Sequence, residues 1–100
     1  MTDAIDRFEP LKPAPRLHLY SKPGCHLCEQ ARLLIDAITR RRAAAGKSTP
    51  IVEERNILAD PAWEKAFFLD IPVLEVGDRR LLLAVDPGRI EAFLADVLGA

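Results

Sequence analysis

The strongest constraint on the fold of this chain is a change of hydrophobic period at its two cysteines. Residues 16–20, "RLHLY", alternate apolar and polar side chains, which predicts a short strand bounded by "SKPG". From Cys25 the period becomes helical, and one predicted helix face carries Leu27, Ala31, Leu34, Ile35 and Ile38. A strand that passes through a tight loop into such a helix begins a βαβ crossover.

The next segments supply the second strand and a second helix. Gly46 and the following "KSTP" are expected to end the first helix. Residues 51–57, β-branched at their start, predict a strand parallel to the first. Asp60-Pro61 predicts an N-cap and first helical residue, and this short helix should run to about residue 68.

The last third of the chain predicts a hairpin and a final helix. Residues 71–76 and 79–85 indicate two strands joined by a tight turn at Gly77-Asp78. Asp86-Pro87 should open a helix with the apolar stripe Ile90, Phe93, Leu94, Val97 and Leu98. The predicted fold class is therefore α/β, with a mixed four-stranded sheet flanked by helices and the order β-α-β-α-β-β-α.

Length and composition favour one small globular domain. The chain has 100 residues, 49% of them hydrophobic and 29% charged. Prolines 10, 13 and 15 exclude a helix from residues 1–15, which we expect to be a flexible tail, and residues 16–100 should form the domain. Repeats and low-complexity tracts are absent from the sequence.

Charge and hydropathy exclude several classes of partner. The net charge of −1 gives no general attraction to nucleic acid or to an anionic membrane. No apolar run approaches the roughly 20 residues that span a bilayer. The N-terminus "MTDAIDRFEP" lacks the apolar core of a secretory signal, so a cytoplasmic location is expected. In that compartment disulfides are usually transient and catalytic.

The spacing of the cysteines suits thiol–disulfide exchange. Cys25 should lie at the helix start, where free N–H groups, the helix dipole and the nearby Lys22 favour a thiolate and lower the pKa of its thiol. Cys28 lies one turn deeper and is close enough to form a small disulfide ring. We therefore expect Cys25 to attack and Cys28 to resolve the mixed disulfide.

Other uses of the cysteine pair stay open. A zinc site needs about four ligands, and beyond the cysteines only His18 and His26 are obvious candidates, so no metal site is predicted. A haem attachment motif would need histidine after Cys28, where the chain has Glu29. Two inert core cysteines are a further alternative. The rival function is a non-enzymatic adaptor or a metal- or iron–sulfur-binding module.

The stretch "LHLYSKPGCHLC", the helix after it and "IPVLEV" together resemble the thioredoxin superfamily, most closely its glutaredoxin-like proteins. The resemblance covers about residues 16–98. It implies a thioredoxin-like fold and a cis Pro72 facing the cysteines, with the backbone of Ile71 pairing with an extended substrate. It also implies a monomer without bound cofactor that acts on protein or small-molecule disulfides, with glutathione or a reductase partner supplying electrons.

Two departures from the family pattern bear on glutathione. The residues between the cysteines are His-Leu, neither Gly-Pro nor Pro-Tyr, and no tryptophan precedes Cys25. Relatives that bind glutathione usually have a double glycine before the final helix, where this chain reads "AVDPGRIE". Lys22 remains available for a glutathione carboxylate. The resemblance therefore implies dithiol chemistry with weakened glutathione recognition.

Side chains around the motif have simpler expected roles. His26 adjoins Cys25 and would favour its thiolate if protonated, or else is an exposed residue with little effect; both interpretations stay open. The remaining aromatic and basic residues are expected to be structural: Phe67, Phe68 and Phe93 in the core, Trp63 partly buried, and residues 40–42 as cations near a helix C-terminus.

Overall fold

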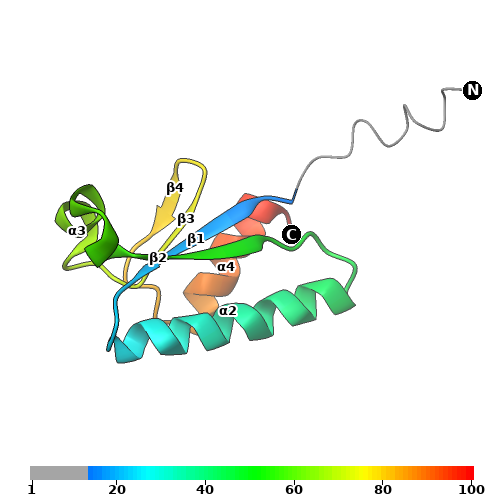
Figure 1. The fold of residues 1–100 in the computed structure, drawn as a ribbon. Helices are drawn as coiled ribbons and strands as arrows, with labels where there is room; N and C mark the ends of the chain where they lie inside the picture. Colours follow the sequence, from blue (N-terminus) through cyan, green and yellow to red (C-terminus); the bar gives the residue numbers. More distant parts are fainter. Residues whose placement is uncertain (1–13) are drawn as a thin grey trace, which may run out of the picture.

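The structure is a computed structural model that describes residues 14–100. Most of the predicted tail, residues 1–15, lies outside this range. The elements follow in the chain order shown in Figure 1: β1 (Arg16–Ser21), α2 (His26–Ala44), β2 (Ile51–Asn56), the 3₁₀ helix η1 (Ile57–Ala59), α3 (Pro61–Phe67), β3 (Val73–Val76), β4 (Arg79–Leu81) and α4 (Pro87–Leu98). The predicted order of strands and helices is confirmed.

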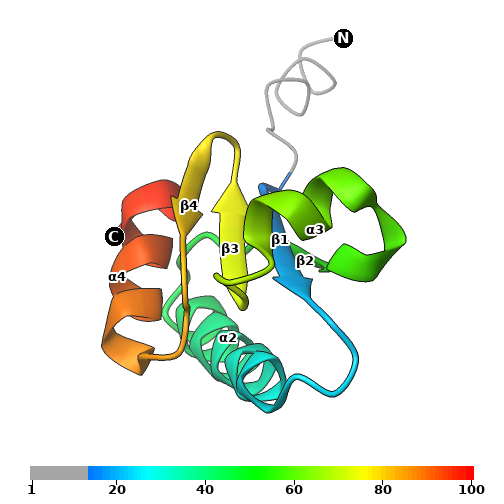
Figure 2. The ribbon, with the colours of Figure 1, turned by 90° about the vertical axis from the view of Figure 1, so that its left-hand side faces the viewer.

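The four strands form one mixed sheet in the order β2-β1-β3-β4. β1 and β2 are parallel, whereas β3 is antiparallel to both β1 and β4. The predicted crossover and hairpin are therefore confirmed. Helices α2 and α4 cover one face of the sheet and α3 lies on the other, as Figures 1 and 2 show.

The main core lies between the sheet and helices α2 and α4. Alternation along β1 directs Leu17 and Leu19 to this face, and both side chains are fully buried. Burial of each such leucine stabilises the fold by roughly 1.5–3 kcal/mol. The other buried members come from both helices, from β3 and from the segment after β4: Ala31, Ile35, Ile38, Leu74, Ala84, Ile90, Phe93 and Leu94.

A smaller core lies under α3, on the opposite face. Tyr20 is its centre, with the Phe67 ring centroid 4.4 Å away and the Trp63 ring edge-on at 5.8 Å. Ile57 and Val73 complete the buried set. Trp63 is partly buried, as predicted.

Next to this small core, a row of polar side chains crosses the sheet. The sequence did not predict this row. His18 pairs in register with Glu75, which pairs with Arg80. The Glu75 carboxylate accepts hydrogen bonds from the Tyr20 hydroxyl and from Arg80 Nε, both at 2.8 Å. Burial alone would raise the pKa of Glu75, but hydrogen bonds from Arg80 and Tyr20 outweigh it and lower the pKa.

The segment after β4 differs from the prediction. Residues 79–85 were expected to form a strand, but β4 ends at Leu81. Leu83 has a φ of 49°, a left-handed conformation that breaks the strand and costs a non-glycine residue roughly 1–2 kcal/mol. Backbone hydrogen bonds from Leu83 N to Asp70 O and from Ala84 N to Pro72 O hold the bend in place.

Two predicted core positions are wrong. Leu27 is 46% exposed because α2 begins only one residue before it, and the core contacts of the helix begin with Cys28 and Ala31. Phe68 is 55% exposed because α3 ends at Phe67, and Phe68 is the residue that caps it.

Both predicted Asp-Pro helix starts are confirmed. Asp60 accepts a hydrogen bond from Ala62 N at 2.8 Å, and Asp86 accepts one from Arg89 N at the same distance. Within residues 14–100, no helix has the length and apolar character needed to cross a membrane.

Candidate active site

The two cysteines lie where β1 passes into α2. Gly24, with a φ of +76°, and a hydrogen bond from Cys25 N to Lys22 O at 3.3 Å form the tight turn between them. Cys25 is the N-cap of α2, with extended backbone angles. Its Sγ accepts a hydrogen bond from the backbone N–H of Cys28 at 3.2 Å. The sulfur thus occupies the place of an ordinary capping oxygen and satisfies a free N–H of the first turn.

Cys25 and Cys28 are joined by a disulfide, with their Cα atoms 5.2 Å apart. The two residues differ sharply in access to solvent. Cys25 is partly exposed, whereas Cys28 is 0% exposed and packs at the core side of α2. An external reagent therefore reaches the Cys25 sulfur far more easily than the Cys28 sulfur.

The Ile71–Pro72 peptide bond is cis, as the family resemblance implied. Pro72 is fully buried, and its carbonyl accepts a hydrogen bond from Ala84 N at 2.8 Å. The carbonyl of Asp70 accepts one from Leu83 N at 2.9 Å. Ile71, between them, makes no backbone hydrogen bond to any other described residue.

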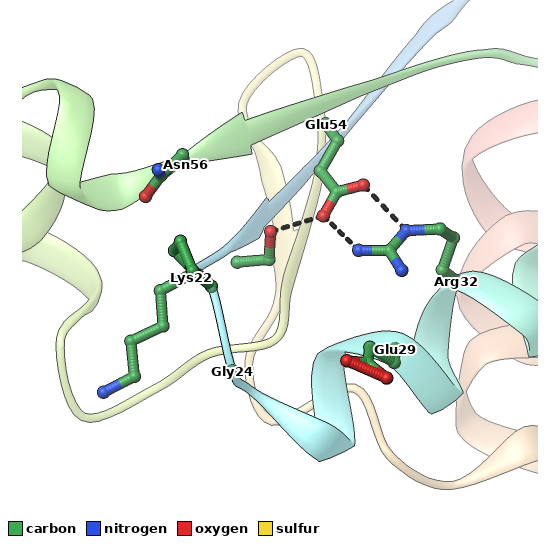
Figure 3. Close-up of a pocket in the computed structure, with 8 residues that line it drawn as sticks. Lys22, Gly24, Glu29, Arg32, Glu54 and Asn56 are labelled. Atoms are coloured by element: carbon green, nitrogen blue, oxygen red, sulfur yellow. Dashed lines mark hydrogen bonds and ion pairs between the residues drawn. The ribbon is translucent and has the colours of Figure 1, made fainter.

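Lys22 is exposed, and its ammonium lies 5.7 Å from the centroid of the Phe68 ring. Lys22 lines a cavity of about 280 Å³, to which Glu54 and Arg32 also contribute. Figure 3 shows that the Lys22 side chain extends away from the paired Glu54 and Arg32. The cation of Lys22 is therefore available at the rim of the site.

Behind the loop, a polar cluster joins β1, β2 and α2. Glu54 accepts hydrogen bonds from the Ser21 hydroxyl at 2.6 Å and from Arg32 Nε at 2.7 Å (Figure 3). A second Arg32 nitrogen also contacts the same carboxylate. The hydrogen bond from Arg32 lowers the pKa of Glu54. The sequence did not predict this cluster, since its members lie on β1, β2 and α2 and come together only when the helix packs against the two parallel strands.

His26 is the first residue of α2 and is exposed. Its Nε2 lies 3.2 Å from Nε2 of Gln30, one turn along the helix. The ring therefore has a partner on its own helix, and its predicted influence on Cys25 stays a prediction.

At the start of α4, Asp86 fills the place that a double glycine would hold. Its carboxylate accepts the Arg89 N–H at 2.8 Å, so one N–H of the first turn of α4 is already bonded within the chain. Among the described residues, no group of three or more His, Cys, Asp and Glu side chains has a geometry that would hold a metal ion.

Comparison with known proteins gives the family. The model of the Glutaredoxin-like domain (DUF836) matches residues 16–95, which include both cysteines and the cis proline. No curated protein matches the chain.

Two solved structures of Northeast Structural Genomics target protein XcR50 from X. campestris are similar to the chain. The X-ray structure superposes with a TM-score of 0.64 at 32% identity, covering 80% of this chain and 96% of the other. The solution structure gives a TM-score of 0.61 at 32% identity, covering 80% and 92%. With its CxxC pair and its thioredoxin-like fold, the chain belongs to the glutaredoxin-like domain family.

Proposed function

We propose that this protein is a thiol–disulfide oxidoreductase whose reacting group is Cys25. The observation that carries the proposal is the difference in exposure between the two cysteines. Cys25 is partly exposed at a helix N-terminus and accepts an N–H hydrogen bond, while Cys28 is buried one turn deeper. Backbone N–H groups and the helix dipole stabilise a thiolate at that position more than a thiol.

The reaction begins with the reduced protein. The Cys25 thiolate attacks one sulfur of a substrate disulfide, a bond forms between the two sulfurs, and the other substrate sulfur leaves as a thiolate. The Cys28 thiol then loses its proton to solvent, and the resulting thiolate attacks the Cys25 sulfur. The mixed disulfide breaks, the second substrate thiolate leaves, and the protein is left with the Cys25–Cys28 disulfide. Two electrons have passed to the substrate.

Ile71, Pro72 and Lys22 are proposed as the substrate-binding residues. The N–H and C=O of Ile71 have no backbone partner among the described residues, which supports pairing with an extended substrate segment. Pro72 is fully buried and keeps Ile71 in a fixed place. The exposed ammonium of Lys22 would attract a carboxylate of the substrate or reductant. His26 is proposed to favour the Cys25 thiolate when its ring is protonated.

The electron donor is proposed to be a thiol co-substrate, either glutathione or a reductase partner, with no bound cofactor. Asp86 argues for weak use of glutathione, since its carboxylate already caps the helix start and would repel an anionic tripeptide. We propose a monomer acting in the cytoplasm on protein or small-molecule disulfides, with no nucleic acid or membrane as partner.

Reduction of a small disulfide tests the proposal. Reduced protein is mixed with bis(2-hydroxyethyl) disulfide, and the free thiol released is measured. The proposal predicts one disulfide reduced for each protein and conversion of Cys25 and Cys28 to a disulfide. A Cys25→Ser variant should reduce none. Equal rates for the variant and the unmodified protein would overturn the assignment.

A further inference from the structure

The end of α2 that lies away from the cysteines surrounds a cavity together with α4. Figure 1 shows α2 running from the loop after β1 to the opposite side of the molecule, where the marked C-terminus also lies. At that end, residues of both helices line a cavity of about 400 Å³. Small-molecule sites in proteins have volumes of roughly 300–1,000 Å³, so this cavity is large enough for a small ligand.

The side chains around this cavity carry an excess of positive charge. Arg41, Arg42 and Lys47 line it, and of the described residues only Glu91 contributes an acidic side chain. Within residues 14–100, the one ion pair of the cavity joins Arg41 to Glu91 at 2.7 Å. The charges of Arg42 and Lys47 therefore have no carboxylate beside them, and the cavity attracts an anion.

Capping of α2 does not account for these cations. The Arg41 carbonyl accepts a hydrogen bond from Ala45 N at 3.1 Å. The Arg42 carbonyl accepts one from Lys47 N at 2.8 Å. Backbone donors thus satisfy these carbonyls at the end of the helix, and Lys47 itself lies beyond the last helical residue.

Arg42 keeps donors that the chain does not use. Its residue is only 8% exposed, and its guanidinium donates through Nε to Ser48 O and through Nη2 to Gly99 O. Nη1, with two N–H groups, bonds to no other described residue. Among the described residues, Thr39 Oγ1 is the only buried side-chain nitrogen or oxygen without a partner, so Nη1 is open to solvent. Because Arg42 is otherwise buried and lines the cavity, a ligand there can reach Nη1.

The rest of the lining is apolar. Ile38 and Ala45 contribute from α2 and its cap, and Ala95 contributes from α4. A bare inorganic anion would leave these side chains facing water. An anion that carries a short apolar chain would cover them and gain about fourfold in affinity for each CH₂ that becomes buried.

We propose that this cavity binds a small organic anion, a carboxylate on a short apolar chain. The carboxylate lies between Lys47 and Nη1 of Arg42, and the chain lies against Ile38 and Ala95. Since α2 has 19 residues, its two ends are about 28 Å apart, and the site is separate from Cys25. The proposal therefore does not depend on the thiol–disulfide function.

Titration of the full chain, in its disulfide form, with sodium hexanoate tests the proposal. Amide shifts in ¹⁵N NMR spectra should saturate at Ala45, Lys47 and Ala95 and stay unchanged at Cys25. Acetate, which lacks the apolar chain, should bind at least about tenfold more weakly. Hexan-1-ol, which lacks the charge, should also bind more weakly than hexanoate.

Three variants separate the contributions of charge and shape. Lys47→Gln should weaken hexanoate binding about fivefold, and Glu91→Gln, which removes the acidic side chain, should strengthen it about threefold. Both residues are exposed, so these changes retain the fold. Ala95→Leu fills the cavity without changing its charge and should abolish binding.

Lys65→Gln is the matched control, because Lys65 is also an exposed lysine but lies on α3, on the other face of the sheet. It should leave hexanoate binding unchanged. Shifts that do not saturate, or an affinity that Lys47→Gln leaves unchanged, would overturn the site. Equal affinities for hexanoate and acetate would overturn the organic anion as its ligand. None of these results bears on disulfide reduction, which is measured separately with bis(2-hydroxyethyl) disulfide.

Discussion

The backbone N–H of Cys28 donates to the sulfur of Cys25 at 3.2 Å, so each cysteine has a different part in the first turn of α2. Cys25 caps the helix with its sulfur, and Cys28 supplies the donor and lies in the core. A thiolate accepts this hydrogen bond more strongly than a thiol does. The arrangement thus favours a charged Cys25 in the reduced protein.

The first prediction concerns the acidity of the two thiols. The pKa of the reduced Cys25 thiol should lie below the ordinary value of about 8.5, because the thiolate gains the N–H hydrogen bond and the helix dipole. Its alkylation by iodoacetamide should therefore persist at pH 6–7, an interval in which an ordinary thiol reacts slowly. Cys28 should stay unmodified because it is buried. Mass spectrometry of each cysteine peptide across pH measures both rates, and equal rates at neutral pH would contradict the assignment.

The second prediction concerns glutathione. Asp86 caps α4 through the Arg89 N–H, and Pro87 supplies no donor. The unmodified protein should therefore show a rate that rises without saturation as glutathione increases. The double variant Asp86→Gly/Pro87→Gly frees the helix start and should raise glutathione-coupled turnover. Steady-state kinetics with glutathione, glutathione reductase and a mixed-disulfide substrate measures this change.

The same dipeptide at another helix provides the control for this test. Asp60-Pro61 opens α3 with an equivalent cap, 2.8 Å from Asp60 to Ala62 N. The double variant Asp60→Gly/Pro61→Gly should lose similar stability, at most about 1 kcal/mol for an aspartate cap replaced by glycine, without a gain in turnover. Efficient, saturable turnover by the unmodified protein would show that Asp86 does not limit glutathione binding.

Much of this fold follows from local sequence patterns. The period change at Cys25 predicts β1 and α2, and the two Asp-Pro pairs predict the starts of α3 and α4. Each of these patterns involves residues that are close together in the sequence, so the element that it predicts can be recognised from the sequence alone. The strand predicted over residues 79–85 fails at Leu83, because hydrogen bonds to the distant Asp70 and Pro72 segment hold a bend in an apolar run.

The third prediction uses the buried carboxylate of Glu75. Its lowered pKa means that the ionised form stabilises the fold above the unfolded pKa of about 4.3, and this contribution is lost as pH falls through the lower folded value. Glu75→Gln should therefore cost about 1–3 kcal/mol at pH 7, with the difference shrinking below about pH 4. Urea unfolding from pH 7 to pH 3 measures it.

An exposed carboxylate provides the control for Glu75. Glu91 pairs with Arg41 on the surface, and its side chain is 57% exposed. Glu91→Gln should change the free energy of unfolding by less than about 0.5 kcal/mol at every pH, because solvent screens such pairs. A Glu75 effect that is equally small, or independent of pH, would show that the polar row contributes little.

The fourth prediction concerns Arg42, a nearly buried arginine at the end of α2. Its guanidinium donates to the carbonyls of Ser48 at 2.7 Å and Gly99 at 2.6 Å, which ties the helix end to the chain end. Arg42→Ala leaves these groups without their donor and should lower the free energy of unfolding by about 1–3 kcal/mol. Arg40→Ala, which removes only an exposed pair with Asp36, should cost about 0.3–0.5 kcal/mol. Equal costs in thermal unfolding would contradict this role.

The candidate site could be predicted only in part from the sequence. The cysteine spacing, the loop before it and the Ile-Pro pair are local signals, and they predict which residues react and which bind substrate. The Ser21–Glu54–Arg32 cluster and the role of Arg42 depend on contacts between distant segments, which no local period encodes. Arg42 was expected to be a cation near a helix C-terminus, and its burial was not predicted.

The central claim is that Cys25 attacks and Cys28 resolves, and trapping the mixed disulfide tests it most directly. Reduced Cys28→Ser and Cys25→Ser proteins are each mixed with bis(2-hydroxyethyl) disulfide, quenched with acid after seconds and measured by mass spectrometry. The account predicts a stable adduct on Cys25 in the Cys28→Ser protein and almost none on Cys28 in the Cys25→Ser protein. An adduct that forms equally fast on Cys28, or on neither cysteine, would contradict it.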